Sequence, residues 1–347
     1  MALHQVIQRV LLIGAHVHSL PPPPQPQPQP PDALLPLIEA VAGPHKRFDE
    51  RAIHYGHRYR SGFWAIYMLS ALAVLFAMMP LALGWDSARH ALHPYAGVWA
   101  FGEVLVICTV STIYALGHRR DWQGQWLRAR TTAELSWYLP ILAPLLDFGA
   151  ADADPNWYLR VFDPGQHLRG ADDVATLCAA NESLARRQLA GAWADRDFVT
   201  RYARWTVDIL DQQRRYHFRT ASKQNALQHR VHQVNTVLFA LTAVGAMLHL
   251  AIHSMWLSMV TTLFPALGAS LHGALAQSEA YRLGTTSERL VAELQGAMER
   301  IREVLRDGDA ATDVVAVKAS IEAAIALILE EHQDWHLLVR PHNLPLA

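Results

Sequence analysis

Residues 231–278 read VHQVNTVLFALTAVGAMLHLAIHSMWLSMVTTLFPALGASLHGALAQS, and this stretch contains no Asp, Glu, Lys or Arg. Its length is more than twice the roughly 20 residues that one helix needs to cross a bilayer. His253-Ser254-Met255-Trp256, near the middle, is the expected turn. Core helices of soluble proteins seldom stay free of charge beyond about 14 residues. The stretch therefore predicts two transmembrane helices.

Two more apolar runs lie nearer the N-terminus. Residues 62–85 contain no charged residue, and residues 95–117 contain only one, Glu103. Tyr95, Trp99 and Tyr114 lie at the ends of the second run, and such aromatic residues favour membrane interfaces. We therefore expect an all-α integral membrane protein with four transmembrane helices in two hairpins and long cytoplasmic helical extensions.

Basic residues gather on one side of these spans, whereas the two loops between paired spans contain only Arg89. Basic flanks are retained in the cytoplasm, so both termini and the middle segment are expected there. The flanking residues are Lys46, Arg47, Arg51, Arg58, Arg60, Arg119, Arg120, Arg128, Arg130, Arg214, Arg215, Arg219, Lys223 and Arg230.

The composition excludes several classes of protein. With 30 basic and 31 acidic residues the net charge is −1, which does not favour a nucleic-acid binder. Cys108 and Cys178 are far apart, so no disulfide framework is predicted. The 19 histidines show no metal-ligand spacing, and there is no glycine-rich phosphate loop. We expect no catalytic, cofactor or metal site, and no enzyme.

The chain divides at shifts in composition. The PPPPQPQPQPP stretch from Pro21 to Pro31 predicts an extended spacer. VLLIGAH ahead of it is compatible with an isolated β-strand, in a stub expected to be disordered or peripheral. Residues 152–170 predict a loop, and residues 312–338 a final helix. The predicted units are an N-terminal stub (1–45), a first hairpin with its helices (46–148), a connector (149–193), a second hairpin with its helices (194–306) and a C-terminal helix and tail (307–347).

One long helix is expected to lead into the third span, because no proline interrupts the chain between Ala194 and that span. Its apolar residues recur at helical spacing and predict one buried stripe. The stripe consists of Phe198, Tyr202, Trp205, Ile209 and Tyr216.

The two hairpins resemble copies of each other. Ala71-Leu72 and Ala77-Met78 recur 169 positions later, at residues 240–241 and 246–247. A Thr-Thr-x-Glu tetrad follows each hairpin, which predicts an internal duplication and marks candidate coupling motifs. The tetrad residues are Thr131, Thr132 and Glu134, and Thr285, Thr286 and Glu288.

Polar and small residues within the spans are the remaining candidates. A charge inside a span is costly unless it is neutralised or faces water, so Glu103 is a candidate functional group. Thr109 and Thr112 further along the helix suggest a polar face toward a bundle interior or pore. The alternative is that Glu103 is protonated and only holds helices together. Small residues in the fourth span allow close helix packing, within or between protomers. These are Ala266, Ser270 and Gly273.

Three segments resemble a known family: HYGHRYRSGFW (54–64), RARTTAEL (128–135) and ILEEHQDWHLL (328–338). They are similar to the SLATT family, the SMODS- and SLOG-associating two-transmembrane effectors of bacteria, with scattered similarity from Phe48 to Leu338. The resemblance implies a membrane effector of nucleotide-linked antiphage systems, in which a cytoplasmic sensor triggers oligomers that permeabilise the inner membrane. Two hairpins replace the usual one, and no nucleotide-sensing or nucleotide-making domain is recognisable. Either sensing resides in a partner, or the N-terminal stub is the remnant of a lost domain.

Three functions remain open. The first is a homo-oligomeric effector that forms a pore in, or disrupts, the bacterial inner membrane in response to a cytoplasmic signal. The second is a resting ion channel or transporter. The third is a membrane scaffold that recruits a partner through Pro21 to Pro31. Each requires membrane lipid as a partner, and the first also requires further copies of the chain.

Overall fold

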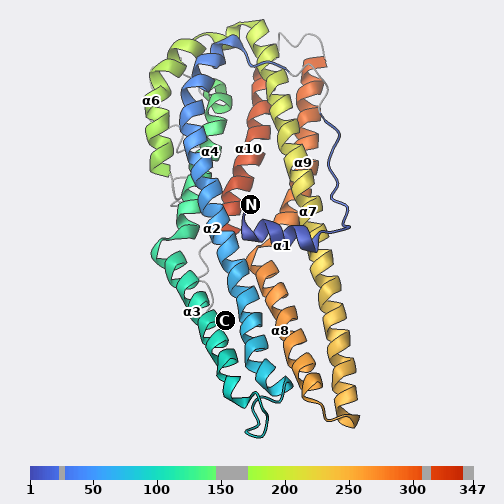
Figure 1. Ribbon diagram of the computed structural model, residues 1–347. Coiled ribbons are helices and arrows are strands. Elements are labelled where there is room, and N and C mark those ends of the chain that lie inside the picture. The colour runs from blue at the N-terminus through green and yellow to red at the C-terminus, as the bar shows by residue number, and fades with distance from the viewer. Residues whose placement is uncertain (23–27, 146–170, 307–313, 339–347) are drawn as a thin grey trace.

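The computed structural model describes residues 1–22, 28–145, 171–306 and 314–338 (Figure 1). Helices account for 87% of these described residues, and no strand occurs among them. The all-α prediction is therefore confirmed. The predicted loop at 152–170 and the central part of the polyproline stretch lie outside the described residues.

The first half is built on one long helix, α2 (Leu35–Ala82). A loop and a short 3₁₀ turn, η2 (His93–Tyr95), lead to α3 (Gly97–Arg119), which returns along α2. The chain then turns into α4 (Trp122–Leu142), which packs along the first part of α2 (Figure 1). Asp121 caps α4, because its carboxylate accepts a hydrogen bond from the Gly124 amide at 3.1 Å.

The second half repeats this order with α7 (Arg196–Ala251), α8 (Met255–Gln277) and α9 (Ala280–Arg306). Asp195 caps α7 by accepting a hydrogen bond from the Asp197 amide at 2.9 Å. Helix α7 then continues without a break for 56 residues. The prediction of one helix leading from the region of Ala194 into the third span is confirmed.

Helix ends and turns support the predicted duplication. Ala82 and Ala251 end α2 and α7, which is the same 169-residue offset that relates the sequence matches. Helices α3 and α8 both contain 23 residues, and two residues separate each from the next helix. The second of those two residues is Asp121 in one half and Glu279 in the other. In the described part of the chain, these are the two non-glycine residues with positive φ, at 42° and 52°.

Four helices, α2, α3, α7 and α8, are long and apolar enough to cross a membrane. Their apolar portions lie in the order α3, α2, α8, α7, because α2 contacts α3 and α8, and α8 contacts α7 (Figure 1). Within the most apolar window, 17% of residues are buried in α2 and α8, but 6% in α3 and α7. Helices α3 and α7 therefore form the two edges of this apolar end.

Most of the other described helices form a helical body. It contains α4, α6 (Ala171–Leu189), α9, α10 (Val314–Leu338) and the first halves of α2 and α7 (Figure 1). Its core comes from all these helices and includes Leu37, Leu139, Val174, Tyr202, Leu294 and Ile321.

The predicted stripe on α7 is mostly buried. Phe198, Tyr202 and Ile209 are buried, and Trp205 packs against the same core. Tyr216 differs, because 51% of its surface is exposed and it lines two cavities instead of the core.

The N-terminal stub corrects one expectation. Residues Leu3–Leu11 form a helix, α1, which lies across α2 and α7 (Figure 1). Val10 and Leu11, part of the proposed strand, therefore belong to a helix, and the strand interpretation is wrong. Helix α1 is amphipathic, and its residue His4 is buried. A helix this short has little stability alone, so its packing on the other helices stabilises it.

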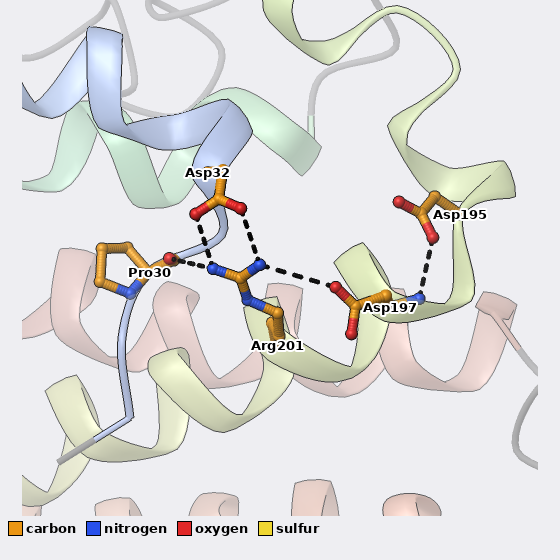
Figure 2. A network of polar contacts seen from close by, with 5 residues as sticks. All are labelled: Pro30, Asp32, Asp195, Asp197 and Arg201. Carbon is orange, nitrogen blue, oxygen red and sulfur yellow. Dashed lines mark hydrogen bonds and ion pairs between the residues drawn. The ribbon is translucent and has the colours of Figure 1, made fainter. Parts of the chain in front are cut away.

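A polar network joins the beginnings of α2 and α7 (Figure 2). The Arg201 guanidinium donates to both carboxylate oxygens of Asp32, at 2.9 and 3.0 Å, and to the Pro30 carbonyl at 3.0 Å. Asp197 lies 3.6 Å from the same guanidinium. The bidentate geometry fixes the end of the proline-rich segment against the second half of the chain.

Candidate functional site

A cavity of about 480 Å³ lies where the body meets the apolar end, beneath α1. Both halves of the chain contribute to its wall, together with α1. The side chains used in the argument below are Tyr59, Arg60 and Trp64 from α2, Trp126 and Arg130 from α4, Lys223 from α7 and Glu279 before α9.

Two cations in this cavity have no acidic partner. Arg60 and Lys223 form no ion pair or hydrogen bond with any residue in the described part of the chain. The Arg60 guanidinium lies over the Trp126 ring, 4.8 Å from its centroid. The Arg60 side chain lines the cavity and is exposed.

The electrostatic environment is unfavourable to both cations. Burial, followed by the nearby charge of Arg130, lowers the pKa of the Arg60 guanidinium. Burial, followed by the charges of Arg60 and Arg219, lowers the pKa of the Lys223 amine. Arg130 itself pairs with Glu134. The cavity thus concentrates positive charge that the protein leaves uncompensated.

Aromatic and amide groups complete the wall. Tyr59 and Trp126 stack with their centroids 5.6 Å apart, and the Gln277 amide donates to the Tyr59 hydroxyl at 3.1 Å. Trp64 is fully buried and its indole nitrogen has no hydrogen-bond partner. Four more glutamines line the cavity: Gln5, Gln8, Gln123 and Gln224.

Helix α1 covers the cavity through a neutral histidine. His4 Nδ1 lies 3.1 Å from the Ser61 hydroxyl, and its ring centroid is 5.4 Å from that of His57. Burial, then the charges of Arg60, His57 and Lys223, lower the pKa of His4 to about 4. Near neutral pH His4 therefore adds no charge to those already in the cavity.

A second cavity of about 410 Å³ adjoins the first, and Arg130, Tyr216 and Thr220 line both. It lies between the two halves of the body, where His217 Nδ1 is 3.3 Å from the Ser287 hydroxyl. Burial lowers the pKa of His217 to about 4, opposed by Glu134 and assisted by Arg130.

These two histidines predict a loss of stability in acid. Below pH 6.5 the unfolded chain binds protons at both side chains, whereas the folded protein resists protonation until about pH 4. The free energy of unfolding should therefore fall as the pH drops from 6.5 to 4, by at most about 3 kcal/mol per histidine. Thermal unfolding of the detergent-solubilised protein across this range measures the effect.

The histidine variants make the test specific. His217→Gln should flatten the pH profile, whereas His229→Gln, at an exposed position of the same helix, should leave its slope unchanged. Equal slopes for the wild type and His217→Gln would contradict the assignment.

Comparisons with known proteins do not assign the site. No family model, curated protein or solved structure matches this chain. The segments 54–64 and 128–135 meet at the first cavity, because Tyr59, Arg60 and Trp64 belong to the first and Arg130 to the second. No cluster of three potential metal ligands occurs among the described residues.

The candidate polar residues of α3 do not gather on one side. Thr109 and Thr112 are exposed, and their hydroxyls donate to their own helix at the Leu105 and Cys108 carbonyls. Glu103 is partly exposed, and nine positions at about 3.6 residues per turn place it on the side opposite to Thr112.

The small residues of α8 lie against helices of the same chain. Ser270 is buried and Ala266 is partly buried. A Cβ added to Gly273 would lie 2.5 Å from Cε1 of Tyr67, so this glycine allows α8 to approach α2 closely.

The two Thr-Thr-x-Glu tetrads have different surroundings. Thr131 and Thr132 are fully buried and donate to the Leu127 and Arg128 carbonyls. In the second tetrad, Thr285 and Glu288 are exposed, Thr286 is partly buried, and Glu288 accepts a hydrogen bond from Asn225 at 2.5 Å. Thr131 is the tenth residue of α4 and Thr285 the sixth of α9, a displacement of about one helical turn.

The sequence pattern does not predict the cavity. It places Arg60 and Lys223 only among the basic flanks of the apolar runs. The available signal was the run Tyr59-Arg60-Ser61-Gly62-Phe63-Trp64, in which a cation adjoins several aromatic residues.

Proposed function

We propose that this protein is a homo-oligomeric effector of the bacterial inner membrane that opens a pore or disrupts the bilayer in response to a cytoplasmic signal. In this proposal α2, α3, α7 and α8 span the membrane, and the body and both termini are cytoplasmic. The basic flanks support this orientation. The short connections at residues 83–96 and 252–254 leave little of the chain on the outer side.

The oligomer proposal rests on the two edges of the apolar end, one formed by α3 and the other by α7. Each hairpin consists of one long helix that leads from the body into the apolar end and one shorter helix that leads back to the body. Within the chain, the returning helix of the second hairpin, α8, packs on the entering helix of the first, α2. The equivalent partners α3 and α7 form no comparable contact in the described structure, and their apolar side chains are exposed. If α3 of one copy packs on α7 of the next, the contact between hairpins repeats throughout the assembly.

Such a head-to-tail contact is heterologous, so it closes into a ring or continues as a filament. A closed ring of helices encloses an opening, which is the arrangement that a pore requires. The resemblance to the SLATT effectors supports the same function.

A cysteine pair tests the contact directly. Ala115 is the nineteenth residue of α3, as Gly273 is of α8, and Thr236 lies as far from the end of α7 as Tyr67 does from the end of α2. Because Gly273 meets Tyr67 within the chain, we expect Ala115→Cys with Thr236→Cys to form disulfides between copies under mild oxidation. Denaturing gels of oxidised membranes should show a ladder of multimers.

The background and control follow from the structure. Cys108 is exposed and is replaced by serine, whereas Cys178 can stay, because burial raises the pKa of its thiol to about 12. Val98→Cys with Thr236→Cys places the two thiols at opposite ends of the spans, so this variant should form no disulfide between copies and remain monomeric. Absence of multimers in the Ala115 pair would refute the contact, and dimers alone would indicate a symmetric pair.

The function is tested in cells. Induced expression together with its genomic neighbours should depolarise the inner membrane, as measured with a potential-sensitive dye. Ala115→Trp, which obstructs the α3 edge, should prevent depolarisation at equal protein levels. Unchanged potential under strong wild-type expression would count against the proposal.

A further inference from the structure

The first cavity has the properties of a binding site for an anion. Its charge is unbalanced, because Arg60 and Lys223 lack carboxylate partners in the described structure and Arg130 adds to the positive potential. Glu279 is the acidic residue in the wall, and its carboxylate lies 3.9 Å from the Arg282 guanidinium instead of pairing with either cation. Arg60 and Lys223 repel each other without a carboxylate between them, and a bound anion would relieve that repulsion.

The kind of anion follows from the donors. A guanidinium presents several N–H groups in a planar fork and an ammonium acts as a point charge, and both are common ligands of phosphate oxygens. The five glutamines add further hydrogen-bonding groups, and the ring of Trp126 holds the Arg60 guanidinium in place. A volume of about 480 Å³ accommodates a phosphate with an attached organic group.

We propose that this cavity binds a phosphate-bearing anion, held by Arg60 from the first half of the chain and Lys223 from the second. The bound phosphate then joins α2 to α7 immediately before both helices enter the apolar end. Helix α1 covers the site, since His4, Gln5 and Gln8 contribute to its wall. The phosphate can belong to a free phosphate ester or to the headgroup of a membrane lipid, because the cavity lies at the boundary of the apolar end.

The test uses the full chain in a non-ionic, phosphate-free detergent with inorganic pyrophosphate as the probe. Pyrophosphate should raise the unfolding temperature in a saturable manner, because a ligand that binds only the folded state stabilises it. Malonate, a dianion without phosphate, should have a much smaller effect. An equal effect of malonate would overturn the phosphate assignment, and no effect of pyrophosphate would overturn the site.

Matched variants locate the binding. Arg60→Gln and Lys223→Gln should each raise the half-saturating pyrophosphate concentration at least about tenfold, the loss expected for one charge-assisted contact. Arg58→Gln removes the same charge from α2 at a side chain that does not line the cavity, and it should have no effect. Arg60→Lys should bind better than Arg60→Gln, which excludes simple misfolding at this position. Unchanged binding in the two glutamine variants would refute the assignment.

Nanodiscs distinguish the two sources of phosphate. If a lipid headgroup occupies the site, anionic lipid should weaken pyrophosphate binding relative to zwitterionic lipid, and native mass spectrometry should show anionic lipid retained by the wild type but not by Arg60→Gln. If the ligand is a free ester, lipid composition should leave the half-saturating concentration unchanged. These experiments measure binding and not membrane activity, so their outcome does not depend on whether the protein forms a pore.

Discussion

We expect Gln213→Pro to leave the protein in the membrane and to abolish its activity. Gln213 lies in the interior of α7, which connects the body to the apolar end without a break. A proline there removes one backbone hydrogen bond and clashes with the preceding turn, at a cost of about 3 kcal/mol and a kink. A helix with an intact backbone ladder carries tilt or rotation to the span, whereas a kinked helix does not.

Gln213→Ala is the matched control, because it keeps the helix and removes only a side chain that lines the second cavity. It should be nearly silent. Fractionation and blotting establish equal membrane levels, and depolarisation then reports activity. A proline variant that inserts normally and stays fully active would show that α7 does not couple the body to the membrane, and the body would be better interpreted as an assembly platform.

Tyr202→Ala should lower the free energy of unfolding far more than Tyr216→Ala. Tyr202 is fully buried, its hydroxyl donates to the Ile141 carbonyl at 2.5 Å, and its ring stacks on Phe198 at 5.7 Å. Truncation leaves a cavity and an unpaired carbonyl in the core of the body, which should cost about 3–5 kcal/mol. The fall in unfolding temperature of the detergent-solubilised protein measures this loss.

Tyr216→Ala removes the same side chain from the same helix at a position that is 51% exposed. Its effect should stay below about 1 kcal/mol, because a substitution away from the core costs little. Comparable destabilisation by the two variants would mean that the stripe on α7 does not form the core of the body.

The four long apolar helices can be predicted from the sequence because each contains a long run with almost no charged residue, a property that depends on no tertiary contact. The continuity of α7 follows in the same way from the absence of proline. The duplication rests on few matching residues, such as Ala71 with Ala240, and the matching helix ends now support it. These features are local, so the pattern of residues is sufficient to predict them.

The other features depend on packing. A nine-residue helix such as α1 has little stability alone, so its docking on α2 and α7 decides its structure. The cavity requires Arg60 and Lys223, far apart in the sequence, to meet under that helix. Tyr216 has the same periodicity as buried Tyr202, and only the position of the cavity distinguishes the two.

The fusion of two hairpins in one chain has a consequence for assembly. Because α2 and α8 already pack within each chain, every second hairpin contact in a ring of copies would form within a single polypeptide. A tethered contact of this kind forms at an effective concentration of order millimolar, far above that of separate chains in a dilute membrane. A ring of given circumference thus needs half as many encounters as one built from single hairpins, and it always contains an even number of hairpins.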